Sequence, residues 1–396
     1  MNTDYDIVII GAGIIGASTA YKLSVLNKSL RIAVLDKETE PNKHQTGRNS
    51  GVIHSGVYYP KDSLKSKNCI DGYHQLVKFL DEHNINYKLT GKLIAAADES
   101  EYEELHRLYE NAELVGLNVE YMDASQIRNI DKSLVSPKGF FVKETGITDY
   151  KEVLNKLIEV SSFANVDFFF GQQINKVETE GSALKLTTKD RVFNSGKLIN
   201  CAGLQSDRVY ELVTGKKSPV TIIPFKGEYF KVDPELYSSD VPIYPVPNRD
   251  FPFLGVHLTR MIDNTLKVGP NAVLSFDREG YDGFGIDLKD AGKIIANKTL
   301  FNIAKKYSST VISELLKHSS KTYFEQNVKK YWSEFDKSKI TGYTCGIRAQ
   351  ATENGQLLND FRIEKAKNQV HVLNAPSPAA TSCLAIADTI IQEIEF

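Results

Sequence analysis

Three glycines near the start of the chain have the spacing of a turn that binds pyrophosphate. Gly11, Gly13 and Gly16 follow a short β-branched apolar run and precede a helical pattern. The first glycine allows a tight turn, the second lets a pyrophosphate approach the backbone, and the third lets helix and strand pack closely. Asp36 closes a second buried strand 20 residues after Gly16 (36 − 16), where its carboxylate can accept hydrogen bonds from ribose hydroxyls. The pattern predicts a bound dinucleotide; a plain glycine-rich turn is the alternative.

Two histidines and one arginine are the side chains best suited to substrate chemistry. His54 lies in a polar, glycine-flanked loop, and the usual pKa of histidine, about 6.5, suits a general base. Arg348 can bind a carboxylate through two parallel N–H···O bonds. His257, on an expected strand, is a rival base or a second carboxylate ligand. Structural roles stay open: His54 could simply donate to a backbone carbonyl, and Arg348 could form a surface ion pair.

Composition narrows the class of protein. A chain of 396 residues exceeds a single core, so two domains are expected. A net charge of −2 gives no support for nucleic-acid binding, and the four cysteines form no C-x-x-C pair, which argues against zinc and against a disulfide framework. No apolar run reaches the roughly 18 residues of a membrane span, and the first strand begins too early to leave room for a signal peptide. We therefore expect a cytoplasmic protein without a metal.

The order of strand and helix patterns predicts a nucleotide-binding fold that a second domain interrupts. Continuous apolar runs, typical of parallel strands, occur near both ends of the chain, whereas the middle is rich in short β patterns. The expected class is α/β, or α+β overall, with a Rossmann-like domain and a β-rich substrate domain containing a mixed or antiparallel sheet and helices. The first domain is predicted to comprise residues 1–86, 140–215 and 345–396, and the second 87–139 and 216–344.

Four stretches of the sequence carry a resemblance to a known family. They are 11–16, 47–59, 253–259, and 346–350 together with 374–382. With them the chain resembles the FAD-dependent oxidoreductases of the D-amino-acid-oxidase and glycine-oxidase superfamily, and within it the L-2-hydroxyglutarate oxidase/dehydrogenase family. The first stretch is generic to dinucleotide binders, whereas the loop around His54 and the Pro-Ser-Pro-Ala-Ala-Thr-Ser turn are specific. Asp36 departs from the glutamate that such flavoproteins usually have.

The resemblance implies a reaction and its participants. FAD would lie extended between the two domains, and hydride would pass from the α-carbon of L-2-hydroxyglutarate to flavin N5, giving 2-oxoglutarate. The electron acceptor would be oxygen or a membrane quinone. Two alternatives stay open: an amino-acid or imino-acid oxidase of the same superfamily, and a flavin-binding protein without turnover.

The expected site residues fall into three groups. The catalytic candidates are His54, Arg348 and His257. The cofactor candidates are Gly11, Gly13, Ile14, Ile15, Gly16, Asp36, Lys37, Arg48, Asn49, Ser50, Gly51, Val177, Ala202, Gly203, Pro378, Ala379, Ala380, Thr381 and Ser382. The substrate candidates are Tyr59, Lys226, Tyr229, Tyr244, His257 and Arg348.

A lysine-rich segment bears on where the protein acts. Residues 289–331 have two or three helical patterns with nine lysines and three acids. A solvated helical face accounts for this composition, and peripheral docking on an anionic membrane surface is the alternative.

Overall fold

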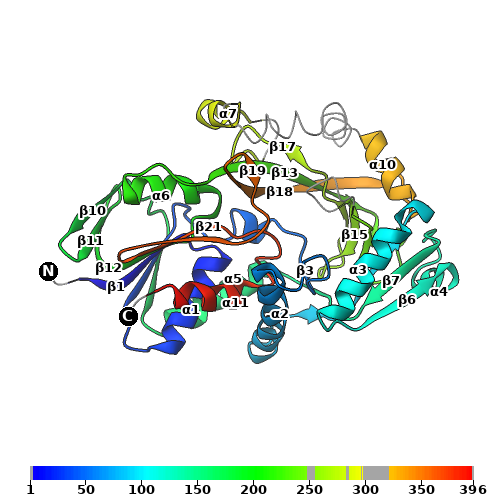
Figure 1. The fold of residues 1–396 in the computed structure, drawn as a ribbon, viewed down its shortest axis with the longest axis horizontal. Helices are drawn as coiled ribbons and strands as arrows, with labels where there is room; N and C mark the ends of the chain where they lie inside the picture. Colours follow the sequence, from blue (N-terminus) through cyan, green and yellow to red (C-terminus); the bar gives the residue numbers. More distant parts are fainter. Residues whose placement is uncertain (1–2, 248–254, 282–284, 296, 298–320, 395–396) are drawn as a thin grey trace.

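Two large β-sheets organise the computed structural model, which describes residues 3–247, 255–281, 285–295, 297 and 321–394 (Figure 1). The first sheet lies toward the two chain ends and the second on the opposite side of the molecule. Part of the lysine-rich segment, residues 298–320, lies outside the described residues, as do Phe253 and Leu254.

The first sheet has eight strands around a parallel centre. Its central order is β21-β12-β1-β2-β9, all parallel, and the antiparallel strands β10, β11 and β20 extend it. The bounds are β1 Tyr5–Ile10, β2 Ile32–Leu35, β9 Val166–Phe169, β10 Lys176–Glu180, β11 Ala183–Thr187, β12 Val192–Asn200, β20 Arg362–Ala366 and β21 Gln369–Asn374. These strands confirm the predicted Rossmann-like half, because segments from both ends of the chain pair in one sheet.

The alternation of side chains along β1 explains how the first sheet is covered. Ile7 and Ile9 pack against helices α1 and α11, whereas Val8 and Ile10 pack toward α6 and the β10–β11 hairpin. Both faces of a parallel strand are therefore buried, as its continuous apolar run predicts. The helices of this half are α1 Ile14–Leu26, α2 Leu64–Glu82, α5 Tyr150–Ser162, α6 Ser206–Thr214 and α11 Cys383–Gln392.

The second sheet has ten strands in the order β19-β18-β13-β16-β15-β14-β5-β7-β6, with β17 paired to β13. Its pairs are antiparallel except β14 with β5. The bounds are β5 Lys92–Ala96, β6 Val119–Asp123, β7 Lys138–Val142, β13 Thr221–Val232, β14 Ile243–Pro245, β15 His257–Arg260, β16 Leu266–Gly269, β17 Val273–Leu274, β18 Ile340–Glu353 and β19 Gln356–Leu357. This mixed sheet is the one that the β-rich middle of the chain predicted.

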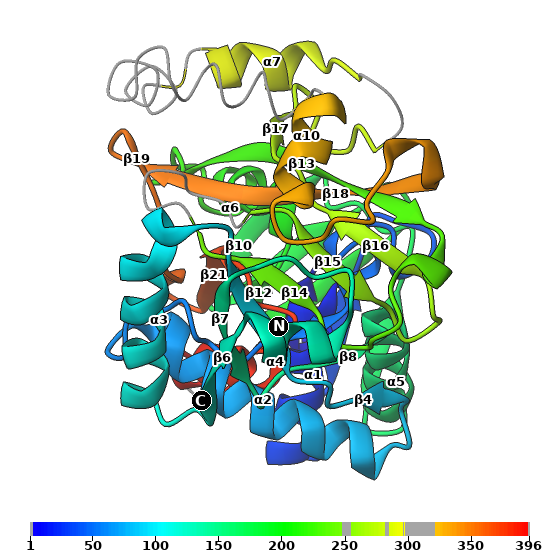
Figure 2. The ribbon, with the colours of Figure 1, turned by 90° about the vertical axis from the view of Figure 1, so that its right-hand side faces the viewer.

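Helices cover both faces of the second sheet. On one face Leu93 and Ala95 of β5 join a core around Trp332, to which α4 and α10 contribute. On the other, Ile94 and Ala96 pack with α3. Helix α7 lies beyond β13 and β18 (Figure 2). The bounds are α3 Tyr102–Leu114, α4 Ala124–Ile130, α7 Leu288–Ile295 and α10 Lys321–Lys329. Among the described residues, no helix has both the length and the apolar character needed to cross a bilayer.

One predicted boundary differs from the pairing of the strands. The sequence placed the return to the nucleotide domain at residue 345, but β18 runs past this point and stays in the second sheet over its whole length. The chain re-enters the first sheet at Arg362, with β20. A small third sheet, formed by β3 Val52–Ile53, β4 Tyr87–Lys88 and β8 Gly146–Thr148, lies where the chain passes between the two halves.

Candidate active site

A cavity of about 1210 Å³ is lined by residues of both halves of the molecule. The first half contributes the glycine turn, the 3₁₀ turn η1 (Gln45–Gly47) with the loop after it, and the turn before α11. The second half contributes the middle of β18 and parts of β13 and β15. The predicted site residues on the cavity wall are Gly11, Gly13, Ile14, Ile15, Asp36, Lys37, Arg48, Asn49, Ser50, His54, Tyr59, Ala202, Gly203, Tyr229, His257, Arg348, Pro378, Ala379, Ala380 and Thr381.

Each glycine of the first turn has the geometry that its position requires. Gly11 has a φ of 104°, and a Cβ there would lie 2.5 Å from the carbonyl oxygen of Cys201. A Cβ on Gly16 would lie 1.9 Å from the Gly11 carbonyl oxygen, so only glycine lets α1 approach the turn. A Cβ on Gly13 would meet only the Thr46 hydroxyl, at 3.6 Å. Gly13 therefore leaves the backbone open to the cavity, as a pyrophosphate needs.

The beginning of α1 and the end of β2 form the nucleotide end of the cavity. Gly13, the N-cap residue of α1, has no side chain to cap the helix, and the first turn has no acidic residue, so no negative charge of this turn opposes the positive end of the helix dipole. The Ile14 N–H donates to the Thr46 hydroxyl, at 3.0 Å. Asp36 accepts from the backbone N–H groups of Ala12 at 2.8 Å and Glu38 at 2.9 Å, one on each carboxylate oxygen. Each oxygen keeps a lone pair for a ribose hydroxyl.

The loop after η1 holds itself in shape with two of the predicted cofactor residues. The Asn49 amide donates to the Thr46 carbonyl oxygen at 2.6 Å and accepts from the Gly51 N–H at 2.8 Å. The Arg48 Nε donates to the Lys43 carbonyl oxygen at 2.9 Å, and its guanidinium lies 4.1 Å from the centre of the Tyr281 ring. Both side chains line the cavity, but these contacts also give them a structural role.

The turn before α11 is fastened to the His54 loop. The Thr381 hydroxyl is fully buried, accepts from the His54 N–H at 3.1 Å and lies 2.9 Å from the Tyr150 hydroxyl. The Tyr150 hydroxyl also donates to the Val52 carbonyl oxygen at 3.1 Å. Loop 54 and turn 378–381, which are 327 residues apart at this contact, therefore face the cavity as one unit.

The substrate candidates of the second half stand on one face of its sheet. Arg348 pairs with Phe225 of β13, and Tyr229, four positions further along β13, points to the same side. The His257 ring lies 6.0 Å from that of Tyr229. Burial raises the pKa of the Tyr229 hydroxyl, while the charge of Arg348 and a hydrogen bond with it oppose the rise. Arg348, Tyr229 and His257 all line the cavity.

Both histidines are held in the neutral form. The pKa of His54 is lowered to about 3. Burial is the main cause, and the charges of Lys92 and Lys65 contribute to the shift. Burial also places the pKa of His257 well below its usual range, with His54, Arg348 and Lys92 adding to the effect. His257 Nδ1 lies 3.2 Å from the Thr259 hydroxyl, which leaves Nε2 for a ligand. A neutral imidazole has a lone pair that can accept a proton, but the lowered pKa makes each histidine a weaker base than an exposed imidazole.

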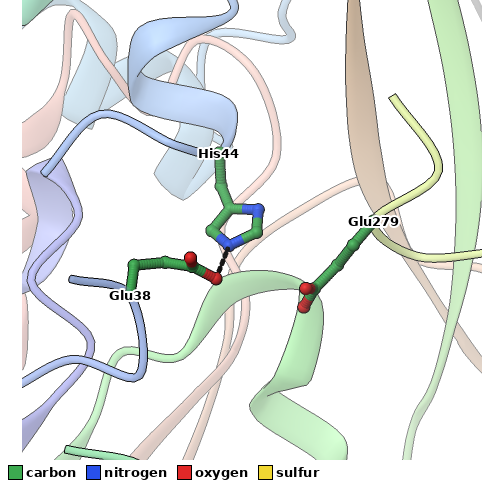
Figure 3. Close-up of side chains that lie close together, drawn as sticks. All are labelled: Glu38, His44 and Glu279. Carbon is green, nitrogen blue, oxygen red and sulfur yellow. Dashed lines mark hydrogen bonds and ion pairs between the residues drawn. The ribbon is translucent and has the colours of Figure 1, made fainter. Parts of the chain in front are cut away.

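Figure 3 shows Glu38, His44 and Glu279, three side chains of the types that can hold a metal ion. Their carboxylate oxygens and imidazole nitrogen lie within 4.8 Å of one another. His44 Nε2 lies 2.9 Å from Glu38. The Lys37 ammonium stands among them: it forms an ion pair with Glu38, donates to Glu279 at 2.8 Å and lies 3.2 Å from His44. Burial opposes the charge of Lys37, but the bonds to both carboxylates raise its pKa. The protein's own cation therefore balances the two carboxylates, and the cluster joins β2 to the segment after β17.

Six predicted residues do not line the cavity: Gly16, Gly51, Val177, Lys226, Tyr244 and Ser382. Gly16 lies inside α1 and lets the helix approach Gly11, and Gly51 shapes a turn with a φ of 68°. Val177 is on the outer strand β10 and packs in an apolar cluster, whereas the cavity is lined by residues 172–174 before that strand. The Lys226 ammonium donates to the carbonyl oxygens of Gly280 and Tyr281, at 3.3 and 3.1 Å.

The sequence interpretation missed several cavity residues. Thr46, which binds the first turn of α1, and Tyr150, which fastens Thr381, both line the cavity. Lys65 and Tyr58 lie on its wall as well. Tyr58 stands beside Tyr59 in the loop that the sequence singled out, so a run of two tyrosines was an available signal. Nothing in the helical pattern of α2 marked Lys65.

Comparison with known proteins gives full-length matches. The model of a family described as "DAO: FAD dependent oxidoreductase" matches residues 6–393. The chain is 41% identical over 392 residues to an L-2-hydroxyglutarate dehydrogenase of Indibacter alkaliphilus, covering 98% of each chain. It is 35% identical to that of Escherichia coli K12, covering 99% of this chain and 93% of the relative. A solved L-α-glycerophosphate oxidase of Mycoplasma pneumoniae with FAD bound has the same fold, with a TM-score of 0.79, 19% identity, and coverage of 100% and 96%.

Proposed function

The chain belongs to the DAO family of FAD-dependent oxidoreductases, and on this premise we propose that it oxidises L-2-hydroxyglutarate to 2-oxoglutarate. One observation carries the choice of substrate: 41% identity to a protein named L-2-hydroxyglutarate dehydrogenase, over nearly the whole of both chains. The solved neighbours are below 25% identity and support the fold alone.

The groups on the cavity wall suit the parts of FAD. Gly13 leaves the backbone open at the start of α1, whose first turn has no acidic residue, which suits two phosphates. Asp36 retains acceptor capacity for a ribose. Turn 378–381 lies on the same wall as His54, where the flavin ring would meet the substrate. Of the predicted cofactor residues, we propose Gly13, Asp36 and Thr381 as the supports of these three parts.

The roles of the substrate residues follow from the chemistry. The chemistry that FAD supplies when bound is acceptance of a hydride from the substrate α-carbon. Arg348 would hold the carboxylate next to that carbon, since its planar guanidinium can form two parallel bonds. His54 would take the hydroxyl proton on a ring nitrogen, and His257 is the rival base through Nε2. Both are neutral at pH 7, because burial lowers the pKa of each.

Anaerobic mixing of the FAD-loaded protein with candidate substrates tests this function. L-2-Hydroxyglutarate should bleach the flavin absorbance fully, and one 2-oxoglutarate should form for each flavin reduced. The enantiomer D-2-hydroxyglutarate is the matched control and should leave the spectrum unchanged. Faster bleaching by L-glutamate or by a cyclic imino acid would overturn the proposal and assign the chain to an amine-oxidising member of the family.

The electron acceptor and the site of action are finer proposals. We propose that oxygen or a membrane quinone reoxidises the cofactor. Peripheral docking would suit a quinone, but three lysines near α7 and α10 already pair with acids of this chain: Lys293 with Glu211, and Lys329 and Lys337 with Glu325. Reoxidation rates with oxygen and with a soluble quinone, together with co-sedimentation on anionic and neutral vesicles, separate these cases.

A further inference from the structure

A lysine, Lys92, stands on the face of the second sheet that carries Arg348, Tyr229 and His257. Ile243 of β14 pairs with Leu258 of β15, so Tyr244 lies beside His257, and their rings stack at 4.3 Å. Tyr244 pairs with Ile94 of β5. Lys92, two positions before Ile94, therefore points to the same side as Tyr244.

The side chains at this end of the face are buried and hold polar groups without partners. Lys92 is 0% exposed and Tyr244 is 1% exposed. Among the residues that the structure describes, the Lys92 ammonium, the Tyr244 hydroxyl and the Tyr58 hydroxyl have no hydrogen-bond partner. An ammonium has three donors and no acceptor, and each phenol hydroxyl has one donor and one acceptor oxygen. The donors of the group therefore outnumber its own acceptors.

The three groups are close together, and one of them, Tyr58, lies on the cavity wall. The Lys92 ammonium lies 4.7 Å from the centre of the Tyr58 ring and 5.3 Å from that of Tyr244. The two rings are 6.5 Å apart. Tyr58 itself lines the cavity, next to His54. Tyr58 is thus the member of the group that a ligand in the cavity can contact directly.

We propose that Lys92, Tyr58 and Tyr244 form an anion subsite that binds the second carboxylate of a dicarboxylate substrate. The strand that carries Lys92 and the strand that carries Arg348 lie on opposite sides of β15, which carries His257. Arg348 would hold the carboxylate next to the reacting carbon, and the subsite would accept only substrates with a second negative charge. The inference rests on the proposed function, since it assigns the remote end of that substrate. Tyr58 must turn to admit the carboxylate to the ammonium.

The energetics of a buried charge favour a binding role for Lys92. A buried ammonium is costly unless it is paired, and the faces of two tyrosine rings repay only part of the loss of hydration. A methionine of similar length at this position would remove the cost. A residue that only held the sheet together should be stabilising. Lys92 is expected to reduce stability and to be useful for the ligand instead.

The charged groups around Lys92 set the pH at which such a subsite works. Burial lowers the pKa of Lys92 to about 7. Among the described groups around the site, Lys65 of α2 also has a pKa close to this value, because burial lowers it to about 8. The pKa values of His54 and His257 lie far below that of Lys92, and the pKa values of Cys69, Tyr58 and Tyr244 lie far above it. A carboxylate binds the charged form, so affinity should fall as pH rises above about 7, until the pKa of the bound form is passed.

A pair of unreactive acids tests the subsite apart from turnover. Glutarate has two carboxylates and pentanoate has one, and neither has a hydroxyl to oxidise. Their binding to the FAD-loaded protein is measured by the perturbation of the flavin spectrum. Lys92→Met should weaken glutarate about 10²-fold, as loss of a bond to a charged group predicts, and pentanoate less than about 3-fold. Lys67→Met, an exposed lysine on the neighbouring helix α2, is the matched control and should change neither.

Two further measurements exclude a merely structural role. The melting temperature of Lys92→Met should equal or exceed that of the wild type, and the decline of glutarate affinity above pH 7 should vanish. A lower melting temperature with unchanged preference for glutarate over pentanoate would overturn the subsite, as would loss of that preference in Lys65→Met but not in Lys92→Met. Failure of L-2-hydroxyglutarate to reduce the flavin, with glutarate preference intact, would instead reject only the proposed function.

Discussion

His54 shows how a single residue can be placed for chemistry by its surroundings. Its backbone N–H is bound to Thr381 and its carbonyl oxygen accepts from the Cys69 thiol at 3.5 Å, so the loop is fixed while the ring stays on the cavity wall. The sequence predicted a base with a pKa near that of free histidine. Burial and two lysines move the pKa to about 3, which keeps the ring unprotonated over the whole neutral range.

The first prediction at this scale concerns His54 as the base. His54→Ala should lower the rate of flavin reduction by about 10²–10⁴-fold while glutarate affinity changes little, because only a group acting in the transition state is removed. Since burial lowers the pKa of His54 to about 3, the wild-type kcat/KM should not fall as the pH decreases through 6.5. Anaerobic rapid mixing between pH 5 and 8 measures both. His74→Ala, at an exposed position of α2, is the control; near wild-type reduction by His54→Ala would transfer the role to His257.

At the scale of elements, the glycine turn was predictable because its pattern is local. Strand, turn, helix and acid follow one another within residues 5–36, and each glycine does what its position suggests. The pairing of β18 was not predictable, because whether Gly346 and Arg348 enter one sheet or the other depends on partners more than a hundred residues away. For the same reason Val177 was placed at the site instead of residues 172–174, and the burial of Lys92 was invisible in a strand pattern.

Gly13→Asp tests the turn as a cofactor support. The position is open, because a Cβ on residue 13 would meet only the Thr46 hydroxyl, at 3.6 Å. The apoprotein should therefore fold with a melting temperature close to that of the wild type. FAD should be lost, because the new carboxylate repels the pyrophosphate at the start of α1. Flavin content after purification and the far-ultraviolet circular dichroism spectrum are the measurements. Retention of stoichiometric FAD would mean that the phosphates bind elsewhere.

At the scale of the whole molecule, function depends on how closely the two sheets meet. β18 of the second sheet passes the loop of the first half at Gly346, where a Cβ would lie 2.2 Å from the Arg48 carbonyl oxygen. The Lys37–Glu279 ion pair and the stacking of Arg48 on Tyr281 join the same two halves. The cavity depends on this contact, because residues of both halves line its wall.

Gly346→Ala should therefore separate the halves. The added methyl group must push β18 away from the Arg48 loop, and we expect a loss of about 1–3 kcal/mol in the free energy of unfolding, with weaker FAD binding. Gly342→Ala on the same strand is the control, because its Cβ would meet only the Lys231 side chain at 3.9 Å. Chemical denaturation and FAD titration of both variants are the measurements. Equal free energies of unfolding and equal FAD affinities of the two variants would show that the contact at Gly346 can accommodate a methyl group.

The pairing of β12 with both β1 and β21 has a consequence for synthesis of the chain on the ribosome. The parallel sheet and the face of α1 that α11 covers stay unfinished until residues 369–392 have been made. At about 5–20 residues per second, α1 waits roughly 20–70 s for this partner. A cofactor that needs the finished sheet can then be captured only after these residues have been made, and during that interval the nascent chain presents apolar surface on which chaperones can act.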